Sequence, residues 1–236
     1  MNNKISKIGM LSALALSCTL TMGARDIVQR TAHYMPEGNA FVCVNGNNRY
    51  TRALYGSTAE WRVETSDRPV FATYKKNQTG NIRFRISDGR QTMWLDEAEY
   101  CKASYEAGRR DYLLKDRRWG KGELDISVLA FPDTEGAVWR FTVSGFDNRK
   151  LKVEAVLSQT VVPKPVRSGD IGSFLKPGTF EPATSETSVL GSVSRLSPGS
   201  IFYFSVDGEN QLSTAENARM QSRYDAAEQL RNKLAS

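Results

Sequence analysis

The sequence has few of the residues on which metal and thiol chemistry depend. Its 236 residues include one histidine, His33, and three cysteines, and no pair of them has the short spacing of a zinc site. It also lacks the glycine patterns that bind phosphates or dinucleotides, and it contains no internal repeat. We therefore expect neither a cofactor nor a metal ion.

Long apolar runs are equally scarce, and the one that exists stands at the N-terminus. Residues 1–24 begin with positive charges at Lys4 and Lys7, continue with an apolar run over residues 8–22 and end in small residues. This is the three-part pattern of a cleaved secretory signal peptide. The run is too short and too rich in serine and threonine for a membrane span of about 20 residues. We predict an exported protein, periplasmic or on the outer surface, with no membrane segment after cleavage.

Cys18 offers a second mode of export, because a bacterial lipoprotein signal is cut just before a lipidated cysteine. The residue pattern before Cys18 is Ala15, Leu16 and Ser17, and the apolar run continues beyond it. Leu16 suits its position in such a signal poorly. Cleavage after Gly23 or Ala24 therefore fits better than lipidation at Cys18.

Charge of one sign is not in strong excess. The formal net charge is +6, and two of the positive charges belong to the predicted signal peptide. The densest basic run, residues 115–121, contains Asp116 and Gly120, which is typical of a solvated loop rather than a phosphate-binding patch. We expect no nucleic-acid partner.

Two cysteines remain after cleavage, Cys43 and Cys101. In an oxidising compartment a disulfide between them would close a long loop and stabilise the fold by about 4 kcal/mol. The alternative is two separate thiols, because Cys43 lies in the apolar run 40–44 and the sequence does not show that the two Cα atoms approach each other. The separate thiols are favoured, and Cys43–Cys101 stays a candidate disulfide.

Most of the chain has the period-two alternation of half-buried antiparallel strands. Apolar side chains alternate with polar ones over residues 82–87, 139–144 and 151–157, and bulky apolar runs at 126–131 and 201–206 are typical of central strands. The expected core positions include Ile82, Phe84, Ile86, Trp139, Phe141, Val143, Phe202 and Phe204.

Turn signals separate these runs, among them Asn45-Gly46, Asp88-Gly89, Asp147-Asn148 and Asp207-Gly208. Residues 163–199 are rich in proline, glycine and serine, and we read them as a long connection with a short strand near residues 188–193. The pattern predicts a mostly β fold, a large antiparallel β-sandwich over residues 25–212.

The last segment, residues 213–236, predicts an amphipathic helix. Residues 213–216 form a capping box, and apolar side chains then recur at spacings of three and four, at Met220, Tyr224, Ala227, Leu230 and Leu234. A helix gains most of its stability from packing, so this stripe needs a cover, either from the sandwich or from a further domain. Without such a cover the helix is the weak point of the chain.

Carboxylates stand close together at Asp96, Glu97 and Glu99, and again at Glu123 and Asp125. Glycosidases use two carboxylates across the sugar bond, but these positions lie in polar or strand-flanking segments, so a surface role is favoured over a catalytic one. We predict no catalytic residue. The four tryptophans, Trp61, Trp94, Trp119 and Trp139, could stack on sugar rings, although core positions are commoner in a sandwich.

A dense group of hydrogen-bonding side chains follows the first turn signal. Such groups on loops are where binding usually concentrates, and three interpretations stay open: contact with a neighbouring domain, sugar binding, and a polar hairpin without a ligand. The candidate contact residues are Asn45, Asn47, Asn48, Arg49, Tyr50, Arg52 and Trp61.

The run NGNNRYTRALYG at residues 45–56, with residues 60–62, 122–125 and 136–139, resembles the exported bacterial family called domain of unknown function four-four-five-zero. The resemblance covers nearly all of residues 26–236. It implies a supersandwich-like N-terminal domain that precedes a helical barrel similar to six-hairpin glycosidases. It also implies that residues 213–236 are the linker helix into that barrel, which this sequence does not contain.

The expected function is a non-catalytic N-terminal accessory domain of an exported carbohydrate-active enzyme, with a glycosidase-like barrel as its partner. The alternative is a free-standing periplasmic carbohydrate-binding module whose ligand is a polysaccharide. That alternative needs an exposed aromatic platform.

Overall fold

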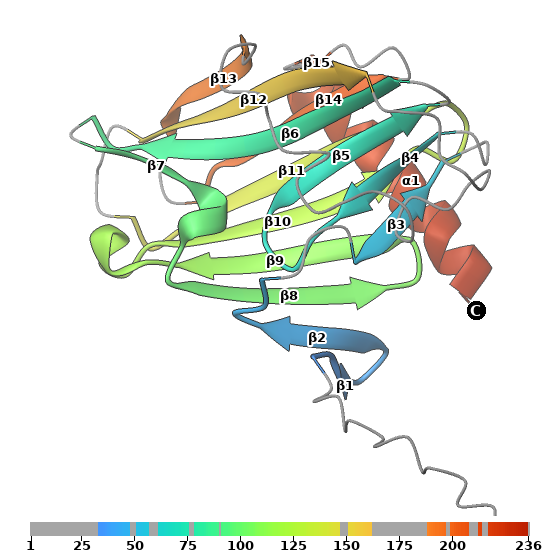
Figure 1. Ribbon diagram of the computed structural model, residues 1–236, viewed down its shortest axis with the longest axis horizontal. Helices are drawn as coiled ribbons and strands as arrows, with labels where there is room; N and C mark the ends of the chain where they lie inside the picture. Colours follow the sequence, from blue (N-terminus) through green and yellow to red (C-terminus); the bar gives the residue numbers. More distant parts are fainter. Residues whose placement is uncertain are drawn as a thin grey trace, which may run out of the picture. The chain divides into compact units, whose positions relative to one another are not determined.

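Antiparallel strands form two sheets that face each other (Figure 1). The computed structural model describes residues 33–47, 51–56, 61–75, 78–89, 91–146, 151–161, 188–196, 199–207, 212–213 and 217–235. The predicted signal peptide, residues 1–24, and the predicted turn at residues 147–148 lie outside this part. The two sheets do not close into a barrel, and their packing confirms the predicted mostly β, sandwich-like fold.

The first sheet has eight strands in the order β1-β2-β8-β9-β10-β11-β14-β15. Its strands β8 to β11 follow one another along the chain as a meander, so neighbouring strands are joined by short connections. The strands are β1 Met35–Glu37, β2 Ala40–Val44, β8 Tyr100–Glu106, β9 Arg109–Lys115, β10 Glu123–Ala130, β11 Gly136–Ser144, β14 Ile201–Asp207 and β15 Leu212–Ser213.

The second sheet has seven strands in the order β13-β12-β6-β5-β4-β3, with β7 paired to β6. Its strands are β3 Arg52–Tyr55, β4 Trp61–Thr65, β5 Val70–Lys75, β6 Gln78–Ser87, β7 Thr92–Trp94, β12 Leu151–Val161 and β13 Ser188–Leu196. The short 3-10 helices η1, Leu95–Glu97, and η2, Arg117–Trp119, lie in the connections β7–β8 and β9–β10. The strand predicted near residues 188–193 is therefore confirmed as β13.

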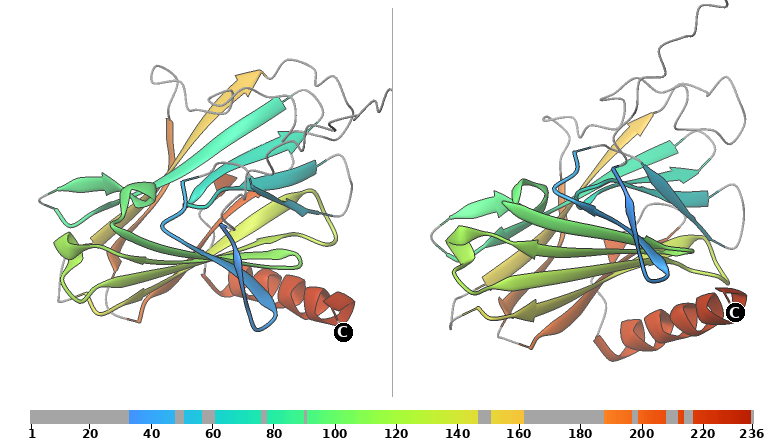
Figure 2. Two further views of the ribbon diagram at one scale, coloured as in Figure 1. Left: turned by 60° about the horizontal axis from the view of Figure 1, so that its bottom comes forward. Right: turned by 90° about the horizontal axis from the view of Figure 1, so that it is seen from below.

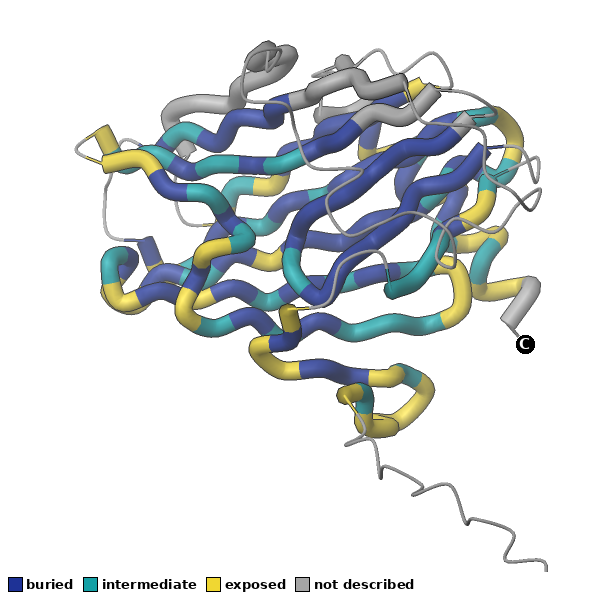
Figure 3. Tube along the Cα trace, in the orientation of Figure 1, coloured by how far each residue is buried: buried dark blue, intermediate teal, exposed yellow. Residues whose placement is uncertain are grey.

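The core lies between the sheets, where the alternation of each strand directs its apolar side chains (Figure 3). All eight positions named from the sequence are buried there, none more than 2% exposed: Ile82, Phe84, Ile86, Trp139, Phe141, Val143, Phe202 and Phe204. The polar residues that alternate with them lie on the outer faces. Period-two alternation thus assigned both the strands and their buried faces.

Helix α1, Asn217–Ala235, packs on the outer face of the eight-stranded sheet, the face turned away from the other sheet (Figure 2). Met220, Tyr224 and Ala227 are each at most 4% exposed, and they form a second apolar cluster with Leu129, Phe131, Val138 and Tyr203 of that sheet. Leu230 is 39% exposed, and Leu234 lies outside the residues whose burial is described. Of the two covers left open by the sequence, the sandwich itself therefore provides the one for the first half of the stripe.

One boundary differs from that predicted. Leu212–Ser213 is a strand paired with β14, so the first residue of the predicted helix belongs to the sandwich. The described helix begins at Asn217, and residues 214–216 of the predicted capping box lie outside the described part. Among the described helices, none has the length and apolar character required to cross a membrane.

Asn45-Gly46 is not a hairpin turn, although its sequence predicts one. β2 ends at Val44 and pairs with β1 and β8, whereas β3 pairs with β4 in the opposite sheet. The chain crosses between sheets here, with Asn45 in the left-handed region at φ 52°. An Asn-Gly pair supplies the left-handed backbone that a sharp turn needs, but it does not decide which strands pair. Asp88-Gly89, by contrast, does turn the chain from β6 into the paired strand β7.

Gly145, just after β11, gives a test of backbone strain with an internal control. Gly145 and Gly89 have φ values of +66° and +85°, and a Cβ atom at Gly145 would lie 2.2 Å from the Lys121 carbonyl oxygen, whereas nothing lies within 4 Å at Gly89. We expect Gly89→Ala to lower the unfolding free energy by about 1–2 kcal/mol, and Gly145→Ala to lower it by a further ~1–3 kcal/mol. Urea unfolding measures both. Equal losses in the two variants would contradict the close approach at Gly145.

Candidate functional site

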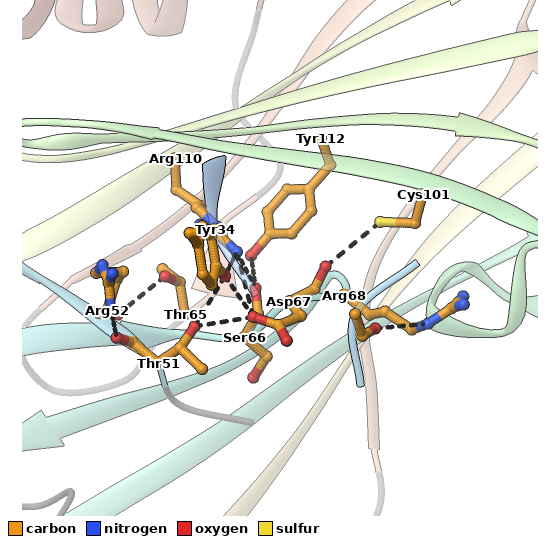
Figure 4. A network of polar contacts seen from close by, with 11 residues as sticks. Tyr34, Thr51, Arg52, Thr65, Ser66, Asp67, Arg68, Cys101, Arg110 and Tyr112 are labelled. Atoms are coloured by element: carbon orange, nitrogen blue, oxygen red, sulfur yellow. Dashed lines mark hydrogen bonds and ion pairs between the residues drawn. The ribbon is translucent and has the colours of Figure 1, made fainter. Parts of the chain in front are cut away.

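The densest polar network in the described part of the chain gathers around Asp67, in the connection between β4 and β5 (Figure 4). The Asp67 carboxylate accepts hydrogen bonds from the Tyr34 hydroxyl and, at 3.2 Å, from Thr51 Oγ1. Nη2 of Arg110 on β9 lies 3.9 Å from Asp67 Oδ1, and both side chains are completely buried. The network therefore joins the segment before β1, the start of β3, the β4–β5 connection and the first sheet.

Arg110 is the cation of this network. Its Nη2 donates to the Tyr34 hydroxyl at 2.7 Å and to the Ser66 carbonyl oxygen at 2.8 Å, and Tyr112 donates to the same carbonyl at 2.8 Å. Arg110 Nε and Nη1 are buried and have no hydrogen-bond partner among the described residues. Burial raises the pKa of Tyr34 and of Tyr112, so both hydroxyl groups stay protonated as donors at neutral pH. The arrangement is a closed structural network, since its charged pair has no exposed surface.

Three of the candidate contact residues bind to their own sandwich at the edge of this network. Asn45 Oδ1 accepts from the Cys101 backbone N–H at 2.9 Å, and Asn47 Oδ1 accepts from Arg68 Nε at 3.2 Å. Arg52 Nη1 donates to the Thr51 carbonyl oxygen at 2.6 Å, and its guanidinium lies over the rings of Tyr34 and Tyr105. The other three residues of the run, Asn48, Arg49 and Tyr50, lie outside the described residues.

Trp61, the remaining candidate contact residue, lies in the core. Its exposed fraction is 0%, so its ring is not available to a ligand or to a second domain. It opens β4, and the odd-numbered residues of this strand face the other sheet. Trp119 and Trp139 are also buried, at 5% and 0% exposed. Trp94 is half-buried, with the Arg83 guanidinium 4.2 Å from its ring centre.

The candidate disulfide is not formed, and both cysteines are buried free thiols. Cys43 on β2 and Cys101 on β8 lie on neighbouring antiparallel strands, where Cys43 is paired with Ala103. Burial raises the pKa of both thiols, that of Cys101 to about 12. Both therefore stay protonated at neutral pH, and a thiol is far less reactive than a thiolate. The arrangement agrees with the alternative of two separate thiols.

Most of the carboxylates singled out in the sequence are held in ion pairs on the surface. Arg83 binds both oxygens of Asp96, at 2.9 and 2.8 Å from its Nη2, and Arg117 Nε lies 3.0 Å from Glu99. Lys115 binds Glu123. A hollow of about 540 Å³ lies beside Asp96 and is also lined by Asn47 and Arg68, but Arg68 is bound to the carbonyl oxygens of Asp96 and Ala98 at its edge. These contacts describe a surface braced by ion pairs.

Asp116 is a buried member of the same region and provides a pH test. It caps η2, and its carboxylate accepts from Arg118 Nε at 2.6 Å, from Arg118 Nη2 at 2.7 Å and from the Glu99 backbone N–H at 3.2 Å. The Arg118 hydrogen bonds lower the pKa of Asp116. The stability that this lowered pKa contributes is present above the unfolded-state value of about 3.9 and is lost as the pH falls through the folded-state pKa.

We therefore expect Asp116→Asn to lower the unfolding free energy by about 1–3 kcal/mol at neutral pH. The difference from the wild type should shrink below about pH 4, where the wild-type carboxylate becomes protonated. Urea unfolding across the acid range measures it, with Asp133→Asn at an exposed position as the control. A difference that stays constant with pH would show that the Asp116 charge is not the cause.

Sequence reasoning missed a group on the outer face of the eight-stranded sheet. Asp111, Asp125, Ser127 and Arg140 line one hollow of about 420 Å³ on strands β9, β10 and β11. The period-two alternation places each of them on the polar face, but only pairing of the strands brings them together. Asp125 was noticed in the sequence only as a neighbour of Glu123.

The fold and these contacts define the class of protein as a two-sheet antiparallel sandwich whose main polar network is internal. Residues 77–182, which include β6 to β12, match the family described as domain of unknown function (DUF4450). Over these residues the chain is similar to that family, which confirms the resemblance to the family found in the sequence. No curated protein matches the chain.

Proposed function

We propose that the chain is a non-catalytic accessory domain of an exported carbohydrate-active enzyme, and that a glycosidase-like helical barrel is its partner. The observation that carries the proposal is the state of the carboxylates. Three of the five carboxylates that invite a sugar-cleaving reading of the sequence, Asp96, Glu99 and Glu123, are each bound to an arginine or lysine. A carboxylate tied to a surface cation braces the fold and is poorly placed to exchange a proton with a substrate.

Two further features support a role beside a second domain. The sandwich is internally cross-braced by the Asp67–Arg110 network, as suits a rigid platform. Helix α1 is anchored by its first half and exposes Leu230 on its second half, so the helix presents an apolar side chain beyond its contact with the sheet. An amphipathic linker helix that also contacts a barrel would have this distribution.

The free-standing binding module is less well supported. It needs an exposed aromatic platform, and three of the four tryptophans are buried in the core. Trp94 is half-buried and already carries Arg83 over its ring. Among the described residues, stacked aromatic recognition of a polysaccharide therefore has little surface to use.

The test uses the mature chain, residues 25–236. We expect it to hydrolyse no glycoside or polysaccharide on its own, and to bind, in trans, the helical barrel of a longer family member, measured by calorimetry and size-exclusion chromatography. The DNA downstream of the Ser236 codon should encode such a barrel, in frame or in a neighbouring gene. Hydrolysis by the purified chain would contradict the proposal, and so would the absence of both a downstream barrel and any binding in trans.

A further inference from the structure

The hollow of about 420 Å³ on the outer face of the eight-stranded sheet spans strands β8 to β11. Two of its lining residues, Ser127 and Arg140, contact Tyr224 of helix α1. Three spacings between neighbouring strands give it a width of about 14 Å. Its polar side chains come from all four strands: Lys102, Ser104, Asp111, Asp125, Arg140 and Thr142. The hollow therefore fits an extended ligand better than a single small ion.

Strand register fixes how these groups lie. Ser127 is directly paired with Asp111 on one side and Arg140 on the other, and Asp125 is paired with Thr142. Asp125 and Arg140 are thus diagonal neighbours on one face, with Cβ atoms about 7–8 Å apart. This separation leaves room for a ligand group between the carboxylate and the guanidinium.

The two central charges do not bind each other. Within the described part of the chain, neither the Asp125 carboxylate nor the Arg140 guanidinium makes a side-chain hydrogen bond or an ion pair, whereas the flanking Asp111 carboxylate accepts from Arg109 Nε at 2.8 Å. The pKa of Asp125 is raised by partial burial and by the neighbouring charges of Glu123 and Asp111. A carboxylate and a guanidinium therefore face one hollow with their hydrogen-bonding capacity unused.

Helix α1 holds the guanidinium in place. The Arg140 guanidinium lies 4.2 Å from the centre of the Tyr224 ring, and the Tyr224 hydroxyl lies 2.6 Å from Ser127 Oγ in a buried hydrogen bond. An arginine that stacks on a ring keeps its in-plane N–H groups available to a ligand. The helix thus orients a donor that would otherwise be mobile, which lowers the entropy cost of binding.

We propose that this hollow binds a neutral saccharide chain. Neighbouring hydroxyl groups of a sugar both donate and accept, so one hydroxyl can donate to Asp125 while the next accepts from Arg140. The lining has two acids and two bases, Asp111 and Asp125 against Lys102 and Arg140, so it favours a ligand without net charge. The proposal gives the proposed accessory domain a ligand class and a binding surface. Its choice of a carbohydrate as the ligand rests on the proposed function.

Calorimetric titration of the mature chain with a panel of neutral oligosaccharides tests the proposal. We expect at least one to bind, and Asp125→Ala and Arg140→Gln each to weaken it about tenfold to a hundredfold, because each removes a hydrogen bond to a charged group. Asp133→Ala and Arg117→Gln make the same charge changes at exposed positions outside the hollow, and they should bind as the wild type does. Thermal unfolding of each variant establishes that it is folded.

Tyr224→Phe separates the roles of the helix. It keeps the ring under Arg140 and loses the hydroxyl that binds Ser127, so saccharide binding should weaken less than in Arg140→Gln. Three results would overturn the proposal: no saccharide bound at millimolar concentration, unchanged binding in both Asp125→Ala and Arg140→Gln, or preferential binding of free amino acids. None of these results depends on glycoside hydrolysis or on barrel binding. The proposed accessory function is therefore tested separately, by the hydrolysis and barrel-binding measurements.

Discussion

Asp67→Ala should lower the unfolding free energy by about 3–5 kcal/mol, because it leaves the buried Arg110 guanidinium without its counter-charge. Both side chains have an exposed fraction of 0%, so water cannot replace the lost carboxylate. Two nitrogen atoms of Arg110 already lack a partner in the wild type within the part of the chain that the structure describes. Loss of Asp67 also removes the acceptor of the Tyr34 and Thr51 hydroxyl groups.

Urea unfolding of Asp67→Ala beside Asp133→Ala measures this loss. Asp133 is exposed, so its replacement should change the unfolding free energy by no more than about 0.5 kcal/mol. The double variant Asp67→Ala/Arg110→Met removes both charges and should recover much of the stability, since a buried ion pair is often replaceable by apolar side chains. A loss below about 1 kcal/mol in Asp67→Ala, or no recovery in the double variant, would show that the pair is not coupled.

The network that these variants test was out of reach of sequence reasoning. Asp67 and Arg110 are 43 positions apart, and neither stands in a motif. Arg110 even breaks the local pattern, because alternation along β9 directs it to the inner face with Tyr112 and Leu114. Only the packing of the two sheets brings the β4–β5 connection, which carries Asp67, against Arg110 of β9.

The alternation of apolar and polar residues was sufficient to predict the buried face of a strand where one face packs against the core and the other is polar. It assigned the inner faces of β6 and β11 correctly. The bulky apolar run of β14 was read as a central strand. Its side chains are apolar on both faces because Phe202 and Phe204 face the core while Tyr203 faces helix α1. The cover of the helix stripe was left open in the sequence, because amphipathic spacing shows that a face is buried and not what buries it.

The candidate contact residues show what the sequence could not predict, namely the partners of their side chains. A crowded polar run after Asn45 predicts hydrogen bonding, and Asn45, Asn47 and Arg52 do bind strongly polar partners. The partners are groups of the same sandwich, which no spacing could reveal. The hollow around Asp125 and Arg140, in turn, draws two or three residues from each of four strands, so no local run of sequence marks it.

Phe84→Ala should cost about 3–5 kcal/mol of unfolding free energy, the range for removal of a buried aromatic ring. Phe84 comes from β6 of the seven-stranded sheet, and its ring centre lies 4.9 Å from that of Phe141 and 5.4 Å from that of Phe204, both in the eight-stranded sheet. Edge-to-face and tilted contacts of this kind add to the stabilisation from burial alone. The loss should therefore be cooperative and weaken the packing of one sheet on the other.

The matched control is Phe41→Ala, since Phe41 is 51% exposed on β2, the strand next to the edge strand β1. It removes the same side chain with little core packing, and we expect a change of less than about 1 kcal/mol. Urea unfolding of both variants, with the near-ultraviolet circular dichroism of the aromatic cluster, measures the difference. Similar losses in the two variants would mean that the aromatic cluster around Phe84 does not hold the sheets together, and the rigid platform on which the proposed accessory role depends would lose its main source of stability.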